Sequence, residues 1–186
     1  TYSLTVLDKI DSQAYRRIAN DSLVSIMKST DFEKVIFRFC LIDCRYKYEY
    51  ENGHIKSAIN VYDPQSIGQL LFDASSLINS ADGKQKRIPI FYCEFSQKRG
   101  PNMAQAVRTF DRIKNQLNYP HVDHPEMYVL EGGYSAFFEK HGSEEFCCPN
   151  QYIKMDDERF NSELRKFDFH KKHYSACATV ARGPPP

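Results

Sequence analysis

The sequence has almost no net charge, no long apolar run and no block of basic residues. Its 25 Lys and Arg residues balance 24 Asp and Glu residues, which leaves a formal net charge of +1. Balanced charge gives no general attraction to nucleic acid, and the apolar runs are too short to predict a transmembrane helix. The first ten residues lack a basic head followed by an apolar core, so we expect no signal peptide. Because the chain begins without Met, we expect it to be part of a longer protein. These absences favour partners other than nucleic acid or membrane.

The cysteines form neither a disulfide framework nor a zinc motif. Their spacing does not match a small disulfide-stabilised secreted domain, and neither a Cys-x-x-Cys pair nor a histidine at zinc-finger spacing occurs. We therefore expect free thiols in a reducing compartment, the nucleus and the cytoplasm, with no metal and no organic cofactor. The six cysteines are Cys40, Cys44, Cys93, Cys147, Cys148 and Cys177.

Strand-like and helix-like segments alternate along the chain. Apolar runs predict buried strands at 34–44, 58–61, 88–92 and 126–130. Helix periodicity and end signals predict helices at 45–54, 64–79, 101–117 and 156–167. Such alternation favours an α/β domain in which a central parallel sheet has helices on both faces.

One predicted loop combines a thiol with a guanidinium. Cys93 directly follows the predicted strand 88–92, and Arg99 comes six positions later, directly before the Gly-Pro that opens the next helix. Ligands of such sheets bind beyond the carboxyl ends of the strands. Cys44 also ends a strand, so we predict Cys44 and Cys93 at the same edge of the sheet.

A thiolate and a phosphate dianion are stabilised by the same surroundings. Both favour the positive end of a helix and a concavity lined by backbone N–H groups, and the fork of Arg99 can bind two phosphate oxygens. Cys93 would then attack phosphorus and form a phosphocysteine that water hydrolyses. The alternative is a buried structural cysteine beside a surface arginine. The predicted phosphate-binding loop comprises Glu94, Phe95, Ser96, Gln97, Lys98 and Arg99.

Longer motifs resemble the catalytic domain of the M-phase inducer phosphatases. They are "YCEFSQKRGPNM" (92–103), "HPEMYVLEGGYSAFF" (124–138) and "LIDCRYKYEYENGHIKSAINV" (41–61), and the last is also a rhodanese-like pattern; "RRIANDSLVSIM" (16–27) resembles the family's opening helix. The resemblance implies a rhodanese-like three-layer domain. It also implies dephosphorylation of Thr and Tyr in cyclin-dependent kinase–cyclin complexes, which activates the kinase and promotes cell-cycle progression.

The extent of the resemblance divides the chain into three parts. It runs from about Arg16 to Phe169, so we expect the catalytic domain at 16–169 and an N-terminal extension at 1–15. We expect the remaining segment, 170–186, to be a tail without fixed structure unless a partner orders it.

The resemblance also implies roles for individual residues. Cys93 matches the nucleophile and Arg99 the phosphate-binding arginine. Cys44 matches a second cysteine that can form a disulfide with the nucleophile, whereas its structural alternative is a small buried residue at a strand end. Arg108, Arg112 and Tyr119 match residues that dock the kinase, and their alternative is a solvated helix face.

The chain departs from the family pattern at two positions beside the loop. Tyr92 stands where the family usually has His, which removes a group that can carry charge. Lys98 stands where the family often has Glu, one candidate for the general acid. Glu94 remains as a possible proton donor, and its alternative is a solvated surface carboxylate.

Two other functions compete with the phosphatase hypothesis. A rhodanese-type sulfurtransferase generally has a loop one residue shorter, and the five residues between Cys93 and Arg99 disfavour it. A domain that binds phosphorylated kinase but turns it over poorly would be consistent with Tyr92 and Lys98. Retention of Cys93 and Arg99 disfavours that reading, and only a turnover measurement separates it from the phosphatase.

Overall fold

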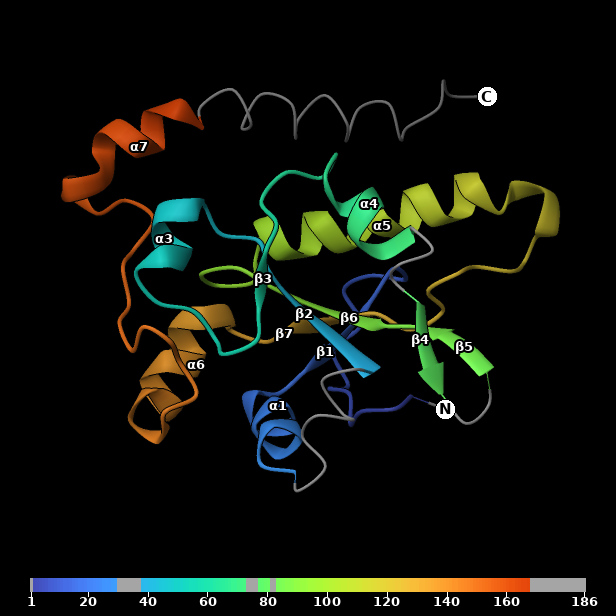
Figure 1. Cartoon of the computed structure of the whole chain (residues 1–186), viewed down its shortest axis with the longest axis horizontal. Helices are drawn as coiled ribbons and strands as arrows, with labels where there is room; N and C mark the ends of the chain where they lie inside the picture. Colours follow the sequence, from blue (N-terminus) through green and yellow to red (C-terminus); the bar gives the residue numbers. More distant parts are fainter. Residues whose placement is uncertain (1, 30–37, 73–76, 81–82, 168–186) are drawn as a thin grey trace.

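The fold is built on one sheet of five parallel strands (Figure 1). The computed structural model describes residues 2–29, 38–72, 77–80 and 83–167. The strands lie in the order β1-β7-β6-β2-β3, and each neighbouring pair is parallel. Their bounds are β1 Arg16–Ile18, β2 Phe39–Asp43, β3 Ile59–Asn60, β6 Ile88–Tyr92 and β7 Tyr128–Leu130.

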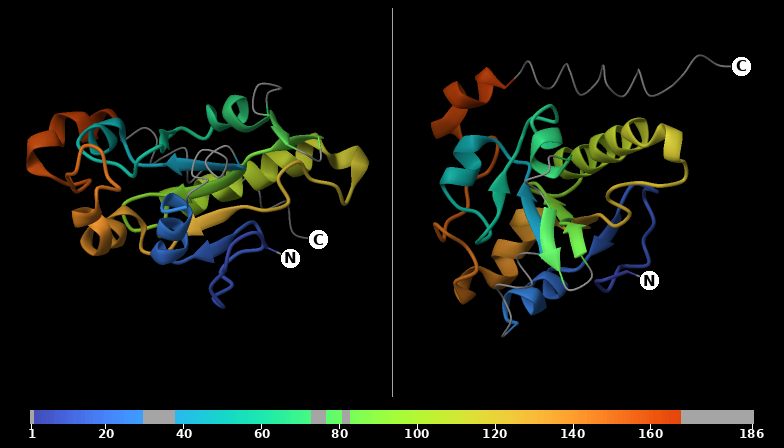
Figure 2. Two further views of the ribbon diagram at one scale, coloured as in Figure 1. Left: turned by 60° about the horizontal axis from the view of Figure 1, so that its bottom comes forward. Right: turned by 45° about the vertical axis from the view of Figure 1, so that its right-hand side comes forward.

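Helices cover both faces of the sheet, which makes it the middle one of three layers (Figures 1 and 2). Helices α4 and α5 pack on one face, α1 and α6 pack on the other, and α3 and α7 lie together at one end. The predicted three-layer α/β architecture is therefore confirmed. The helix bounds are α1 Asn20–Met27, α3 Lys47–Glu51, α4 Ile67–Phe72, α5 Arg99–Lys114, α6 Gly133–His141 and α7 Asn161–Lys166.

Strand β6 shows why its sequence is apolar at every position. Successive side chains of a strand point to opposite faces of the sheet. Phe91 packs in the core beneath α5, whereas Ile90 and Tyr92 pack in the core toward α1 and α6. A strand that is covered on both faces needs no polar side, as the run at 88–92 predicted.

Two predicted helices are only partly correct. Helix α4 ends at Phe72, and Leu77–Ser80 forms strand β4, which pairs antiparallel with β5 (Gly83–Lys86). The predicted helix 64–79 is therefore wrong at its end, because apolar periodicity read along the chain does not reveal cross-strand pairing. In the predicted opening helix 16–27, the first three residues are β1, and α1 begins at Asn20.

The described residues that precede β1 pack against the domain. The amide of Leu7 donates to the Arg17 carbonyl at 2.9 Å, and the Ser3 hydroxyl donates to Glu126 at 2.9 Å. The described residues of the predicted extension 1–15 therefore contact the domain at these positions. The predicted tail 170–186 lies outside the described residues, and the boundaries of the three parts stay a prediction.

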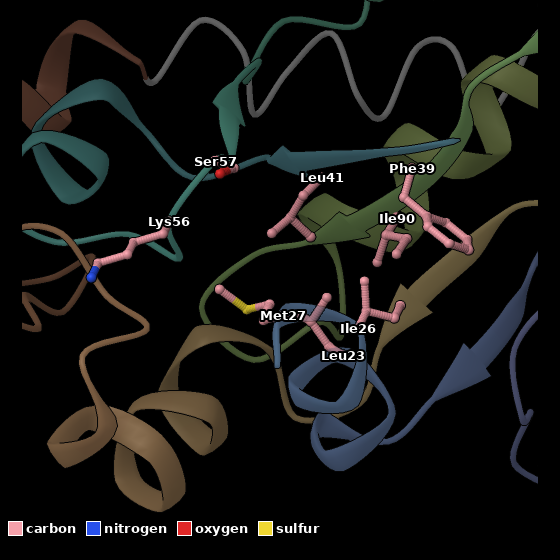
Figure 3. Close-up of a pocket in the computed structure, with 8 residues that line it drawn as sticks. All are labelled: Leu23, Ile26, Met27, Phe39, Leu41, Lys56, Ser57 and Ile90. Atoms are coloured by element: carbon pink, nitrogen blue, oxygen red, sulfur yellow. The ribbon is translucent and has the colours of Figure 1, made fainter. Parts of the chain in front are cut away.

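A small pocket lies between α1 and the sheet (Figure 3). Its lining is mostly apolar and includes Leu23 and Met27 of α1 with Leu41 and Ile90 of the strands. Cys93 belongs to the core cluster on the opposite face of the sheet. The pocket is therefore separate from the candidate active site.

Candidate active site

Cys93 lies directly beyond the carboxyl end of β6 and is 4% exposed. Strand β2 runs beside β6 with Asp43 opposite Tyr92, and the amide of Cys44 donates to the Tyr92 carbonyl at 2.8 Å. Cys44 and Cys93 therefore lie side by side at one sheet edge, as the predicted topology required. Burial raises the pKa of the Cys44 thiol well above its usual range, so Cys44 stays protonated at neutral pH.

The loop after Cys93 is held by its carbonyl groups. The carbonyls of Cys93 and Glu94 accept from the amides of Tyr134 and Ser135, each at 2.9 Å. Among the described residues, no protein acceptor receives the N–H groups of residues 94–98. A run of successive unpaired amides at the start of a helix is a site for an anion.

Gly133 allows α6 to approach this loop closely. Its φ is +63°, and a Cβ there would lie 2.2 Å from the Cys93 oxygen and 2.7 Å from the Glu94 oxygen. The loop itself turns at Ser96, whose φ is +50° and whose side chain is buried. The Ser96 hydroxyl accepts from the Cys93 amide at 3.5 Å, which places it beside the predicted nucleophile.

Arg99 is the first residue of α5 and forms a fork with a buried carboxylate. Its Nη1 and Nη2 donate to the two oxygens of Glu49, the second at 2.9 Å. Its guanidinium also lies 5.0 Å from the ring centre of Tyr46. Burial opposes the charged form, but Glu49 outweighs it and raises the pKa of Arg99, so the guanidinium stays a cation.

Sequence reasoning missed Glu49. The residue lies 50 positions before Arg99 in the chain, in α3, where its side chain also accepts from the Tyr46 amide at 2.9 Å as part of a capping box. Tyr46 is not one of the usual N-cap residues, so this segment carries no capping-box signature in the sequence. No sequence signal pairs that carboxylate with Arg99.

The other predicted loop residues divide into buried and exposed positions. Phe95 is 50% exposed, and Gln97 and Lys98 are also exposed. Glu94 is only 4% exposed, which excludes the alternative of a solvated carboxylate. Its oxygens accept from the Tyr152 hydroxyl at 2.7 Å and from the Met155 amide at 3.3 Å. A proton-donor role for Glu94 stays a prediction.

The predicted docking residues lie on α5 and just after it, but Arg108 is not on the surface. Arg108 is 6% exposed, lies 3.5 Å from Asp111 and donates to the Ala14 carbonyl at 3.3 Å. The prediction that Arg108 lies on a solvated or docking face is therefore wrong, because the N-terminal segment covers its side chain. Arg112 is exposed, and Tyr119 is 88% exposed.

Within the described ranges, no three His, Cys, Asp or Glu side chains come together as a metal site would require. The helices described there are also too short or too polar to cross a membrane.

Comparison with known proteins assigns the family. The sequence profile of the Rhodanese-like domain matches residues 21–140. The chain belongs to the rhodanese-like domain family. Among solved structures, it is similar to Ygr203w of Saccharomyces cerevisiae, a homologue of single-domain rhodanese and of the Cdc25 phosphatase catalytic domain, with a TM-score of 0.52. That likeness has 24% identity, covers 74% of this chain and 91% of the yeast chain, and supports the fold.

Within this family, the chain is similar to the M-phase inducer phosphatases, as its motifs predicted. It is 42% identical to M-phase inducer phosphatase cdc-25.3 of Caenorhabditis elegans, over 94% of this chain and 55% of the relative. It is 41% identical to human M-phase inducer phosphatase 1, over 83% of this chain and 28% of the relative. The chain thus spans about half the length of the first relative and less of the second.

Proposed function

We propose that this chain is the catalytic domain of a dual-specificity protein phosphatase that acts on a phosphorylated cyclin-dependent kinase–cyclin complex. The observation that carries the proposal is Cys93 at the end of β6, beside a loop of unpaired amides that leads to Arg99. The likeness to M-phase inducer phosphatases supports both the phosphatase chemistry and the kinase partner. Activation of that kinase would promote cell-cycle progression in the nucleus and the cytoplasm.

The reaction follows from the loop geometry. The Cys93 thiolate attacks phosphorus, the S–P bond forms, and the bond to the Tyr or Thr oxygen breaks as that oxygen gains a proton. Water then attacks the phosphocysteine, which releases inorganic phosphate and restores the thiolate. The amides of residues 94–98 and the cationic Arg99 stabilise the charge on the phosphoryl oxygens in both steps.

Cys44 would act as a thiol that protects the nucleophile from irreversible oxidation. Peroxide converts the Cys93 thiolate to a sulfenic acid, and the neighbouring Cys44 thiol displaces its oxygen as water to form a disulfide. The adjacent positions of Cys44 and Cys93 support this step. A reductant would restore both thiols.

A surface on α5 and after it would dock the kinase. Arg112 and Tyr119 are exposed there, and so are the apolar side chains of Phe110, Ile113 and Leu117, which are 47%, 64% and 92% exposed. Such a surface could bind a protein partner through apolar contact as well as charge.

The first experiment is hydrolysis of a small aryl phosphate by the wild type and by Cys93→Ser, with reductant and after mild peroxide. We expect turnover that requires Cys93, is lost after peroxide and returns with reductant. In Cys44→Ser, peroxide inactivation should become largely irreversible. Tungstate binding by the wild type without turnover would instead favour a domain that binds phosphorylated kinase. Sulfur transfer to cyanide without phosphatase activity would favour a sulfurtransferase.

A further inference from the structure

Arg99 lies between two carboxylates that are held differently. Glu49 takes one N–H from each terminal nitrogen of Arg99. Glu94 Oε2 lies 3.8 Å from Arg99 Nη2, which is too far for a hydrogen bond. The guanidinium has five N–H groups, so its Nε–H and the second N–H on each terminal nitrogen remain for a phosphate.

Glu94 is the nearest competitor for those N–H groups. Its carboxylate is buried, and a buried carboxylate beside a guanidinium pairs strongly with it unless other donors satisfy it. Those other donors are the Tyr152 hydroxyl on Oε1 and the Met155 amide on Oε2. Burial raises the pKa of Tyr152 to about 12, so the phenol keeps the proton that it donates to Glu94.

The segment that carries Tyr152 and Met155 is itself fastened to the site. We call residues 152–167 the C-terminal strap. The Tyr48 hydroxyl of α3 donates to the Met155 carbonyl, and the Tyr48 ring stacks on Phe160 at 5.2 Å. At the end of the strap, Phe167 stacks on Tyr46 at 4.2 Å, and Tyr46 lies against Arg99. These contacts with Tyr48 and Tyr46 fix where the strap lies relative to Arg99.

We propose that the C-terminal strap is part of the phosphate site, in which Tyr152 and the Met155 amide hold Glu94 away from Arg99 and so keep the outer N–H groups of Arg99 for phosphate. This inference rests on the proposed function for its ligand, a phosphate dianion. Tyr152 and Glu94 are positioning residues in it. Without the Tyr152 donor, Glu94 turns to Arg99 and competes with the phosphate.

The test uses Tyr152→Phe, which removes the donor and keeps the ring that packs 5.8 Å from Tyr134 and 6.0 Å from Phe138. We expect the dissociation constant for tungstate, measured by calorimetry, to rise about tenfold. The value of kcat/KM should fall by a similar factor for aryl phosphates with good and with poor leaving groups. The matched control is Tyr50→Phe, which removes a hydroxyl that donates to the Ala58 carbonyl at 2.8 Å, and it should change neither quantity.

A second substitution separates positioning from proton donation. Gln cannot form an ion pair with Arg99, so Tyr152→Phe combined with Glu94→Gln should restore tungstate binding to within about twofold of the wild type. If Glu94 were only the proton donor, Glu94→Gln alone would slow the substrate with the poor leaving group and spare the good one. Unchanged tungstate binding in Tyr152→Phe, or no rescue in the double variant, would overturn the inference.

Because the test measures tungstate binding, it can decide this inference even if the proposed phosphatase activity is absent. A wild type that binds tungstate without hydrolysing aryl phosphate would refute the phosphatase, while the binding comparison would still decide the role of Tyr152. If Tyr152→Phe fails to fold, Glu94→Gln alone decides, because the inference requires it to bind tungstate at least as tightly as the wild type. A wild type that binds no oxyanion would overturn both proposals.

Discussion

Tyr92 is a neutral residue directly before Cys93, the proposed nucleophile. Its side chain is fully buried, and its hydroxyl accepts from the Ile55 amide at 3.3 Å. Burial raises the pKa of Tyr92 well above its usual range, so the phenol stays uncharged at neutral pH. Its role is therefore to link the β6 end to the segment after β2.

Tyr92→Phe should lower the free energy of unfolding by about 1–3 kcal/mol, because it leaves the buried Ile55 amide without its hydroxyl partner. Urea denaturation monitored by circular dichroism measures the change. Tyr2→Phe serves as the control, since Tyr2 is 44% exposed, and it should change the free energy of unfolding by less than about 0.5 kcal/mol. If the two variants had the same free energy of unfolding, the hydrogen bond between the Ile55 amide and the Tyr92 hydroxyl would not stabilise the fold.

At the level of elements, the C-terminal end of α5 is tied to the loop that follows it. Lys114 and Lys86 each place Nζ 2.6 Å from Asp123 Oδ2, and Asp123 is largely buried by its neighbours. Burial alone would raise the pKa of Asp123, but the two lysines outweigh it and lower the pKa to about 2. This lowered pKa is a stability contribution that depends on pH.

Asp123→Asn should therefore lower the free energy of unfolding by about 1–2 kcal/mol at pH 7. The contribution of Asp123 is complete above the unfolded-state pKa near 4 and disappears as pH falls toward 2, so the two proteins should converge in acid. Urea titrations at pH 7, 4 and 3 measure this. The control is Glu163→Gln, which breaks an exposed pair with Lys166 and should have little effect at any of these pH values. A difference that is independent of pH would contradict the assignment.

The exposed face of α5 gives a prediction about substrate choice. Arg112→Ala should lower kcat/KM about tenfold on a phosphorylated kinase–cyclin complex, a loss of about 1.4 kcal/mol, and leave hydrolysis of a small aryl phosphate unchanged. Steady-state kinetics with both substrates measure the difference. Lys140→Ala on α6 removes an exposed cation from the other face of the sheet and should affect neither substrate. Equal losses on both substrates would place Arg112 in the catalytic site instead.

Some elements could be predicted from the sequence because their signals are local. The run 88–92 and the helix that follows it are recognisable from apolar periodicity and from the Gly-Pro at the helix start. Arg108 was misplaced because helical spacing alone puts it on a polar face, whereas the carbonyl of Ala14, 94 residues away, accepts from it in the interior. The β4–β5 pairing was missed for the same reason, since pairing is a contact between segments.

At the scale of the whole molecule, the loop after Cys93 is held by segments from the N-terminal and the C-terminal parts of the described chain. Arg17 of β1 donates from Nη1 and Nη2 to the Ser96 carbonyl at 3.2 Å, α6 donates to the Cys93 and Glu94 carbonyls, and the C-terminal strap holds the Glu94 side chain. Cys93 and Arg99 could be predicted from the sequence because they lie six positions apart on one loop. The supports could not, because they lie between 41 and 79 residues away in sequence from the loop residues that they contact.

Among these supports, Arg17 joins the loop to other segments as well, so its loss should affect both stability and the loop. It is 6% exposed and also lies 2.6 Å from Asp11 and 2.7 Å from Glu131. Arg17→Met should lower the free energy of unfolding by about 2–3 kcal/mol, and it should speed hydrogen exchange at the Tyr134 and Ser135 amides, which donate to the loop carbonyls. Arg16→Met is the matched control, because among the described residues the Arg16 side chain donates to the nearby carbonyls of Ser12 and Tyr15 and not to the loop. If the Tyr134 and Ser135 amides exchange at the same rate in both variants, Arg17 stabilises β1 without holding the loop, and the loop must take its shape from α6 and the strap alone.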